Sequence, residues 1–70
     1  MMYEKDSKEY KAMKEFIVKQ IELKRAVKPE DFENEETCET ISRFWNEHTR
    51  GKVACFLKEI IREEGLEQWK

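Results

Sequence analysis

The sequence predicts an all-α protein: a small three-helix bundle in which a long N-terminal helix packs on an antiparallel helical hairpin. Three observations carry this prediction. Apolar side chains recur at helical spacing in three separate stretches. The 70 residues include only two Gly and one Pro that would interrupt helices. Eight aromatic residues and a net charge of only −2 argue against disorder, although 43% of the residues are charged. The length allows a single domain over residues 1–70.

The first helix is expected over residues 5–27. With successive residues 100° apart, most of its apolar side chains fall within an arc of roughly 160°. Asp6 and Ser7 are both candidates for its N-cap. Because a proline restricts the residue before it, Pro29 predicts that the helix ends near Val27.

The second helix is expected over residues 35–48, after one short helical turn at 29–32. Pro29 suits the first position of that turn, and Phe32 is expected to close one end of the core. Asn34 precedes the acidic first turn of the helix and is its predicted N-cap. The apolar side chains that share one face of this helix are Cys38, Ile41, Phe44 and Trp45.

The third helix is expected over residues 52–64. Its apolar stripe is rotated by roughly 140° from that of the second helix, so residues 35–64 do not form one straight helix. Gly51 is the expected break. At the other end, Gly65 fits the left-handed position of a Schellman motif, which places the following residue on Ile61.

Charge is segregated along the chain. Residues 1–28 carry a net charge of +3, residues 29–49 carry −6, and residues 50–70 carry +1. The acidic middle segment has two interpretations. Its carboxylates pair with lysines of the first helix within the bundle, or they face a basic partner.

The expected setting is the cytoplasm, without membrane association. No apolar stretch approaches the ~18 residues of a membrane span, and the N-terminus lacks the apolar region of a secretory signal. Cys38 and Cys55 are therefore expected to be reduced thiols. Neither they nor His48 show metal-ligand spacing, so no metal and no cofactor is expected.

Two functional classes find little support in the residues. The single histidine has no convincing nucleophile beside it in sequence, so an enzyme is not expected. A small helix-turn-helix DNA-binding regulator is the alternative function, with residues 52–64 as the recognition helix. Lys52, Lys58 and Arg62 supply positive charge there, but Glu59 interrupts it, and the chain's pI is near 5.5. Nucleic acid is therefore not the expected partner.

The expected function is non-enzymatic protein binding, as an adaptor, regulator or inhibitor that acts through one helical face. The carboxylates chosen to steer a basic partner are Glu35, Glu36, Glu39 and Glu47. Leu66 and Trp69 are chosen as its apolar anchor. Because the first helix is expected to be much longer than the other two, a second copy would help to cover it. A homodimer is therefore also expected.

Overall fold

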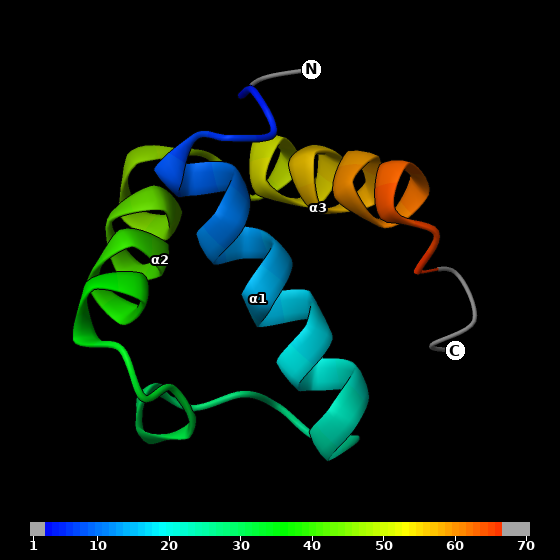
Figure 1. Ribbon diagram of the computed structural model, residues 1–70. Helices are drawn as coiled ribbons and strands as arrows, with labels where there is room; N and C mark the ends of the chain where they lie inside the picture. Colours follow the sequence, from blue (N-terminus) through cyan, green and yellow to red (C-terminus); the bar gives the residue numbers. More distant parts are fainter. Residues whose placement is uncertain (1–2, 67–70) are drawn as a thin grey trace.

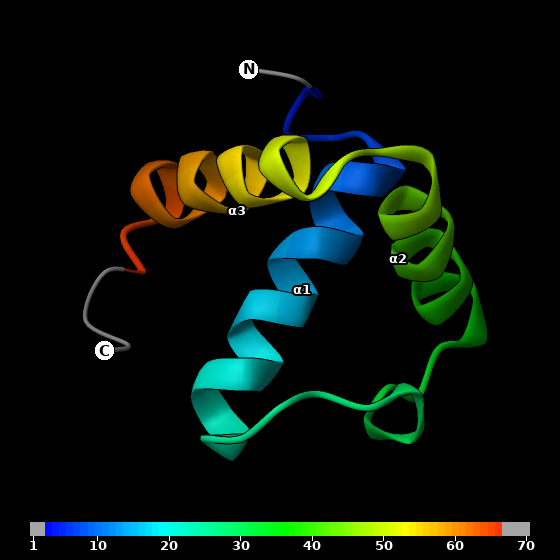
Figure 2. The same ribbon diagram turned by 180° about the vertical axis from the view of Figure 1, so that it is seen from behind.

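The computed structural model describes residues 3–66 of the chain. Its elements in order are α1 (Lys8–Leu23), the 3-10 turn η1 (Pro29–Asp31), α2 (Glu35–Glu47) and α3 (Arg50–Glu64). The helices pack against one another, and the described residues contain no strand, so the predicted all-α bundle is confirmed. Helix α1 packs against both α2 and α3, which meet at a two-residue connection and diverge away from it (Figures 1 and 2).

Each helix begins at a polar side chain that caps backbone N–H groups of its first turn. These caps satisfy donors that have no partner within the helix. At the start of α1, the Ser7 hydroxyl accepts a hydrogen bond from the Tyr10 N–H at 3.1 Å. At the start of α2, the Asn34 amide oxygen accepts one from the Glu36 N–H at 2.8 Å. At the start of α3, the Thr49 hydroxyl accepts one from the Lys52 N–H at 3.3 Å. Ser7 rather than Asp6 is therefore the cap of α1, and the prediction of Asn34 is confirmed.

Helix α1 is shorter than residues 5–27, so the predicted bounds are wrong at both ends. It begins after its cap, at Lys8, and ends at Leu23, four residues before Val27. Lys24 adopts the left-handed conformation with φ 55° and donates its N–H to the Gln20 carbonyl at 2.9 Å. This bond is typical of a helix C-terminus, so the end is set by the local backbone and not by the proline further on.

The linker between α1 and α2 is organised by Asp31. Its carboxylate accepts two hydrogen bonds from the Arg25 guanidinium, at 2.8 and 2.9 Å, and one from the Lys28 backbone N–H at 2.7 Å. Both donors lie where the sequence predicted the last turn of the first helix, or directly after it. The predicted turn over 29–32 is present as η1, with the proline at its first position.

The break between α2 and α3 lies two residues before Gly51. Helix α2 ends at Glu47, and His48 is extended with φ −126° and ψ 153°. Because Thr49 then caps a new helix, α3 begins at Arg50 and Gly51 lies inside its first turn. The prediction that Gly51 makes the break is therefore wrong, and α3 begins two residues before the expected start at about residue 52.

The C-terminus of α3 confirms the predicted Schellman motif. Gly65 is left-handed with φ 66°, and its N–H donates to the Arg62 carbonyl at 3.4 Å. The Leu66 N–H donates to the Ile61 carbonyl at 2.9 Å, which is the six-to-one bond of the motif. Both apolar side chains of this contact pack against the core.

The core lies where the three helices meet. Its buried members are Tyr10, Ala12, Met13, Ile17, Ile41, Phe44, Val53, Phe56 and Ile60. Tyr3 folds back from the N-terminal segment onto Phe44 and Phe56, with ring centroids 5.6 and 5.4 Å away. The C-terminal part of α1 extends beyond this core, toward the linker and η1 (Figure 1). The walls of the groove described below come from that region and from α2.

Candidate binding groove

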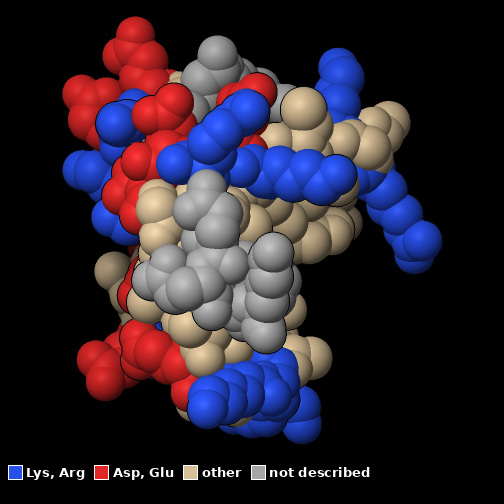
Figure 3. Space-filling view, turned by 90° about the vertical axis from the view of Figure 1, so that its right-hand side faces the viewer, with Lys and Arg blue, Asp and Glu red and all other residues tan. Residues whose placement is uncertain are grey.

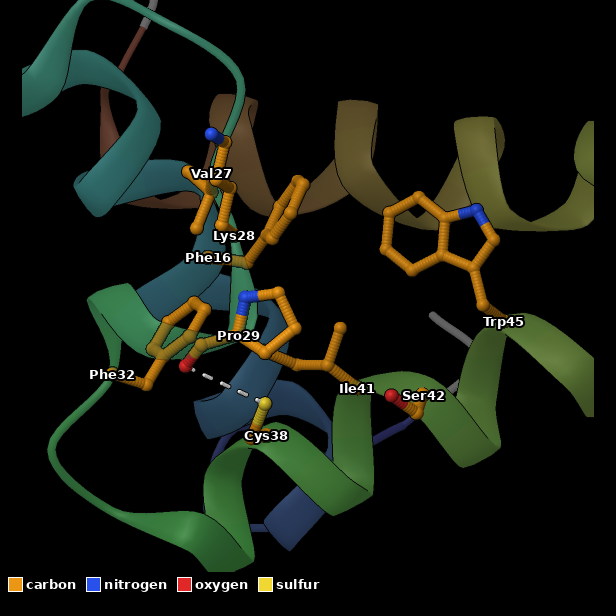
Figure 4. A pocket seen from close by; sticks show the side chains of 9 residues that line it. All are labelled: Phe16, Val27, Lys28, Pro29, Phe32, Cys38, Ile41, Ser42 and Trp45. Atoms are coloured by element: carbon orange, nitrogen blue, oxygen red, sulfur yellow. Dashed lines mark hydrogen bonds between the residues drawn. The ribbon is translucent and has the colours of Figure 1, made fainter.

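An apolar groove of about 220 Å³ lies between the C-terminal part of α1, the linker and α2. Figure 4 shows the side chains that line it, which come from all three segments. They are Phe16, Val27, Lys28, Pro29, Phe32, Cys38, Ile41, Ser42 and Trp45. Most of these side chains are apolar, as is usual for binding sites, which have few polar groups among apolar walls.

Trp45 is the most exposed large apolar side chain of this groove. It keeps 39% of its surface in solvent, whereas its neighbour Phe44 keeps 2%. The indole lies against Phe16, with ring centroids 5.1 Å apart and the planes tilted by 57°. Successive residues of a helix are rotated by 100° about its axis. Phe44 lies near the centre of the apolar face of α2, so Trp45 lies at the margin of that face.

The linker wall of the groove is held in place by polar contacts. Hydrogen bonds from Arg25 and from the Lys28 backbone favour the charged carboxylate and lower the pKa of Asp31 from 3.8 to about 2, so these contacts persist well below neutral pH. The Cys38 thiol contacts the Pro29 carbonyl at 3.8 Å and joins α2 to the start of η1. The groove is therefore a feature of the folded chain before any partner binds.

Carboxylates lie beside the apolar groove, along the outer side of α2. A second depression shares Pro29, Phe32, Cys38 and Ser42 with the groove and continues along that helix. The acidic side chains that line it are Glu30, Glu35, Glu39 and Glu47, and we call these four the acidic rim. Within residues 3–66, none of the four makes an ion pair shorter than 4.0 Å. Arg43 is the cation that lines the same depression.

The residues predicted as a binding site are only partly brought together. Glu35, Glu39 and Glu47 lie in the acidic rim, which also contains Glu30. Glu36 instead faces α1, where its carboxylate pairs with the Lys8 ammonium at 3.0 Å. One carboxylate of the acidic segment therefore pairs with a lysine of α1, as the first interpretation expects, whereas Glu35, Glu39 and Glu47 make no ion pair within residues 3–66.

Of the two predicted apolar anchors, only Leu66 belongs to the described residues. Leu66 is half-buried against the core at the end of α3, so its side chain serves the fold. Trp69 lies outside the described residues. Trp45 was not among the predicted anchors, because its spacing from Ile41 assigns it to the buried face of the helix. Its position at the edge of that face, one residue after the more central Phe44, is the feature of the sequence that could have indicated its exposure.

The described residues offer other chemistry little support. No group of three or more His, Cys, Asp or Glu side chains among residues 3–66 is placed to hold a metal ion. The Cys38 thiol is half-buried in the groove and the Cys55 thiol is exposed on α3; both are free. No helix within the described part of the chain has the length and apolarity needed to cross a membrane.

The basic residues of α3 do not form one stripe. Lys58 and Arg62 are one turn apart, whereas Lys52 lies on the side of the helix that carries Glu59 and Glu63. Figure 3 looks onto the side of the molecule toward which α3 points, where Lys and Arg side chains lie in an upper group, which borders carboxylates, and in a lower group. This arrangement gives the DNA-binding alternative no support, because phosphate binding needs a continuous basic face.

Comparison of the chain with models of protein families, with curated proteins and with solved structures gives no match. The geometry and charges of the groove are therefore the observations from which a function can be inferred.

Proposed function

We propose that this chain is a non-enzymatic protein-binding module and that the apolar groove holds an anchoring side chain of its partner. One observation carries the proposal: Trp45 stays 39% exposed at an apolar groove in a chain whose other aromatic side chains, among the described residues, are at least half-buried. Tryptophan dominates the energetics of many protein interfaces, especially where it borders a well-packed pocket. An adaptor, regulator or inhibitor needs this kind of surface and no catalytic groups.

The rigidity of the groove supports the same proposal. Its α2 wall begins at a capped helix terminus, and its linker wall is tied down by the carboxylate of Asp31. A site formed before binding loses less conformational entropy when a partner docks. An intracellular setting, in which the free thiols of Cys38 and Cys55 stay reduced, is part of the proposal.

A protein other than a second copy of the chain is the better candidate for this groove. The predicted homodimer depended on a long first helix, but α1 has 16 residues against 13 in α2 and 15 in α3. A symmetric dimer across the groove would also place two acidic rims against each other. Homodimerisation stays a prediction, and sedimentation equilibrium over a range of concentrations tests it.

Site-specific crosslinking in cells that natively express the chain tests the proposed function. A photoreactive amino acid at Ser42, which is exposed and lines the groove, should capture the bound partner. The same amino acid at Lys52, exposed on α3, serves as the control position. The proposal requires a discrete adduct from position 42 that position 52 does not give.

Two variants decide whether that adduct depends on the anchor. Trp45→Ala should abolish the adduct formed from position 42. Leu23→Ala should preserve it, because Leu23 is equally exposed, at 38% against 39%, but does not line the groove. Equal adducts from both positions, or an adduct that survives Trp45→Ala in a folded protein, would exclude the groove as the binding site.

A further inference from the structure

We infer that the partner docks on this groove with a basic segment whose cations lie against the acidic rim. The inference rests on the proposed function and adds the chemistry of the partner to it. Its starting point is that the four carboxylates of the rim have no ion-pair partner among residues 3–66, in a bundle that pairs Glu36, Glu63, Glu64 and Asp31 with cations.

The spacing of the carboxylates specifies where the cations of the partner should lie. Glu35 and Glu39 are one turn apart on α2, about 6 Å along the axis, and Glu47 follows about 12 Å further on. Arg43 occupies the turn between Glu39 and Glu47 and repels a cation at that height. The matching segment therefore carries two cations close together and a third about 12 Å away, with none between them.

The position of the groove relative to this stripe orients the segment. Cys38, Ser42 and Trp45 follow one another at helical spacing along α2, beside the stripe of carboxylates. An apolar side chain of the partner then enters next to the indole while its cations reach the rim. The segment consequently runs along the length of α2, and not across it.

Charge complementarity also selects against other occupants. A second copy brings its own acidic rim. An acidic segment would meet the four carboxylates of the rim, with only Arg43 and Lys28 as cations lining the two depressions. Exposed charges of this kind raise the association rate with an oppositely charged partner and lower it with a like-charged one, and added salt screens both effects.

Glu36 supplies a matched control for the rim. It lies on the same helix and carries the same charge, but its carboxylate pairs with Lys8 on the side that faces α1. Glu35→Gln, Glu39→Gln and Glu47→Gln remove charges from exposed side chains that make no ion pair in residues 3–66, so these variants should remain folded. Circular dichroism at 222 nm verifies this.

The experiment is a selection of random 12-residue peptides displayed on phage against the full chain, with Trp45→Ala as the counter-selection protein. The inference expects peptides enriched in Lys and Arg around an aromatic or aliphatic residue. For the best peptide, the triple Gln variant of the rim should lower the association rate about tenfold at low salt, and Glu36→Gln should leave it within about twofold.

The possible results separate the inference from the proposed function. The enriched peptides could instead be neutral or acidic, or could bind the triple Gln variant as fast as the wild type. Either result would overturn the inference of a basic partner and leave the groove as a docking site. The absence of any enrichment over Trp45→Ala would instead overturn the groove itself. If Glu36→Gln weakens the binding of a basic peptide as much as the triple Gln variant does, the effect comes from the net charge of the chain. That result would also overturn the assigned rim.

Discussion

Replacing Tyr10 by Phe removes one oxygen from the core and leaves the ring in place. The ring is 2% exposed, and its hydroxyl donates a hydrogen bond to the Glu64 carboxylate at 2.7 Å, which ties α1 to the end of α3. Hydrogen bonds to charged groups contribute about 1.5–3 kcal/mol. Because Glu64 is partly exposed and keeps its ion pair with Lys14 at 3.0 Å, we expect a loss of about 1.5 kcal/mol, the low end of that range.

That loss is large for a chain of this size. At 0.05–0.15 kcal/mol per residue, the free energy of unfolding is about 3.5–10 kcal/mol in total. The melting temperature of Tyr10→Phe should fall by about 6–12 °C. Urea titration followed by circular dichroism at 222 nm measures the free-energy difference directly.

The same residue predicts a pH dependence that the variant lacks. Burial and the hydrogen bond with Glu64 raise the pKa of Tyr10 from 10.0 to about 12. The folded phenol therefore holds its proton more tightly than the unfolded one, so this part of the stability is complete below pH 10 and declines as the pH rises toward 12. At about 1.4 kcal/mol per pKa unit, the advantage of the wild type over Tyr10→Phe should disappear near pH 11.

If the two proteins differ by less than about 0.3 kcal/mol at pH 7, the hydrogen bond from Tyr10 to the Glu64 carboxylate contributes almost nothing to stability, contrary to the expected loss. A difference that stays constant from pH 7 to pH 11.5 would contradict the raised pKa.

The remaining predictions concern the linker, the glycines and the thiols. Asp31→Asn should remove a stabilising effect that the wild type shows above pH 4 and loses as the pH falls toward its pKa of about 2; acid titrations of both proteins test this. Gly65→Ala should destabilise the chain by about 1 kcal/mol because φ is 66° at this residue. Gly51→Ala should stabilise it by about 0.5–1 kcal/mol because the backbone is helical there and no atom outside the local helix backbone lies within 4 Å of the added methyl group. Thermal melts of the two variants test the opposite signs. A chromogenic disulfide reagent should modify exposed Cys55 before half-buried Cys38, and a bound partner should protect only Cys38; equal protection of both would place the partner elsewhere.

Local signals in the sequence predicted the features that depend on a few neighbouring residues. The cap at Asn34 and the Schellman motif at Gly65 were predicted because a side-chain acceptor or a left-handed glycine acts within one turn. The helical stripes gave the three-helix architecture because apolar spacing reflects burial directly.

Features that depend on contacts across the linker were not predictable in the same way. Helix α1 ends at Leu23 because Lys24 turns left-handed, and Asp31 holds the backbone of the residues beyond it. Lysine has no intrinsic preference for that conformation, so no residue at this position indicates the end. The choice of Gly51 as the break failed because Thr49 caps the helix earlier.

The candidate site was predictable only for its charge. The acidic segment of the sequence indicated a surface on α2, but which carboxylates stay free depends on where α1 brings its lysines. Lys8 reaches Glu36 and leaves Glu39 unpaired. The exposure of Trp45 depends on how the linker and Phe16 fill the space beside α2, which spacing along a single helix does not reveal.

Nuclear magnetic resonance of the isotope-labelled chain with its crosslinked partner, or with the best selected peptide, shows whether binding occurs in the groove beside Trp45. If the groove is the binding site, the largest shifts should fall on the Trp45 indole N–H and on the backbone amides of Phe16, Phe32, Cys38 and Ser42, with α3 unchanged. Shifts centred on α3, or a Trp45 indole signal unaffected by saturating ligand, would place binding on another surface and exclude the groove.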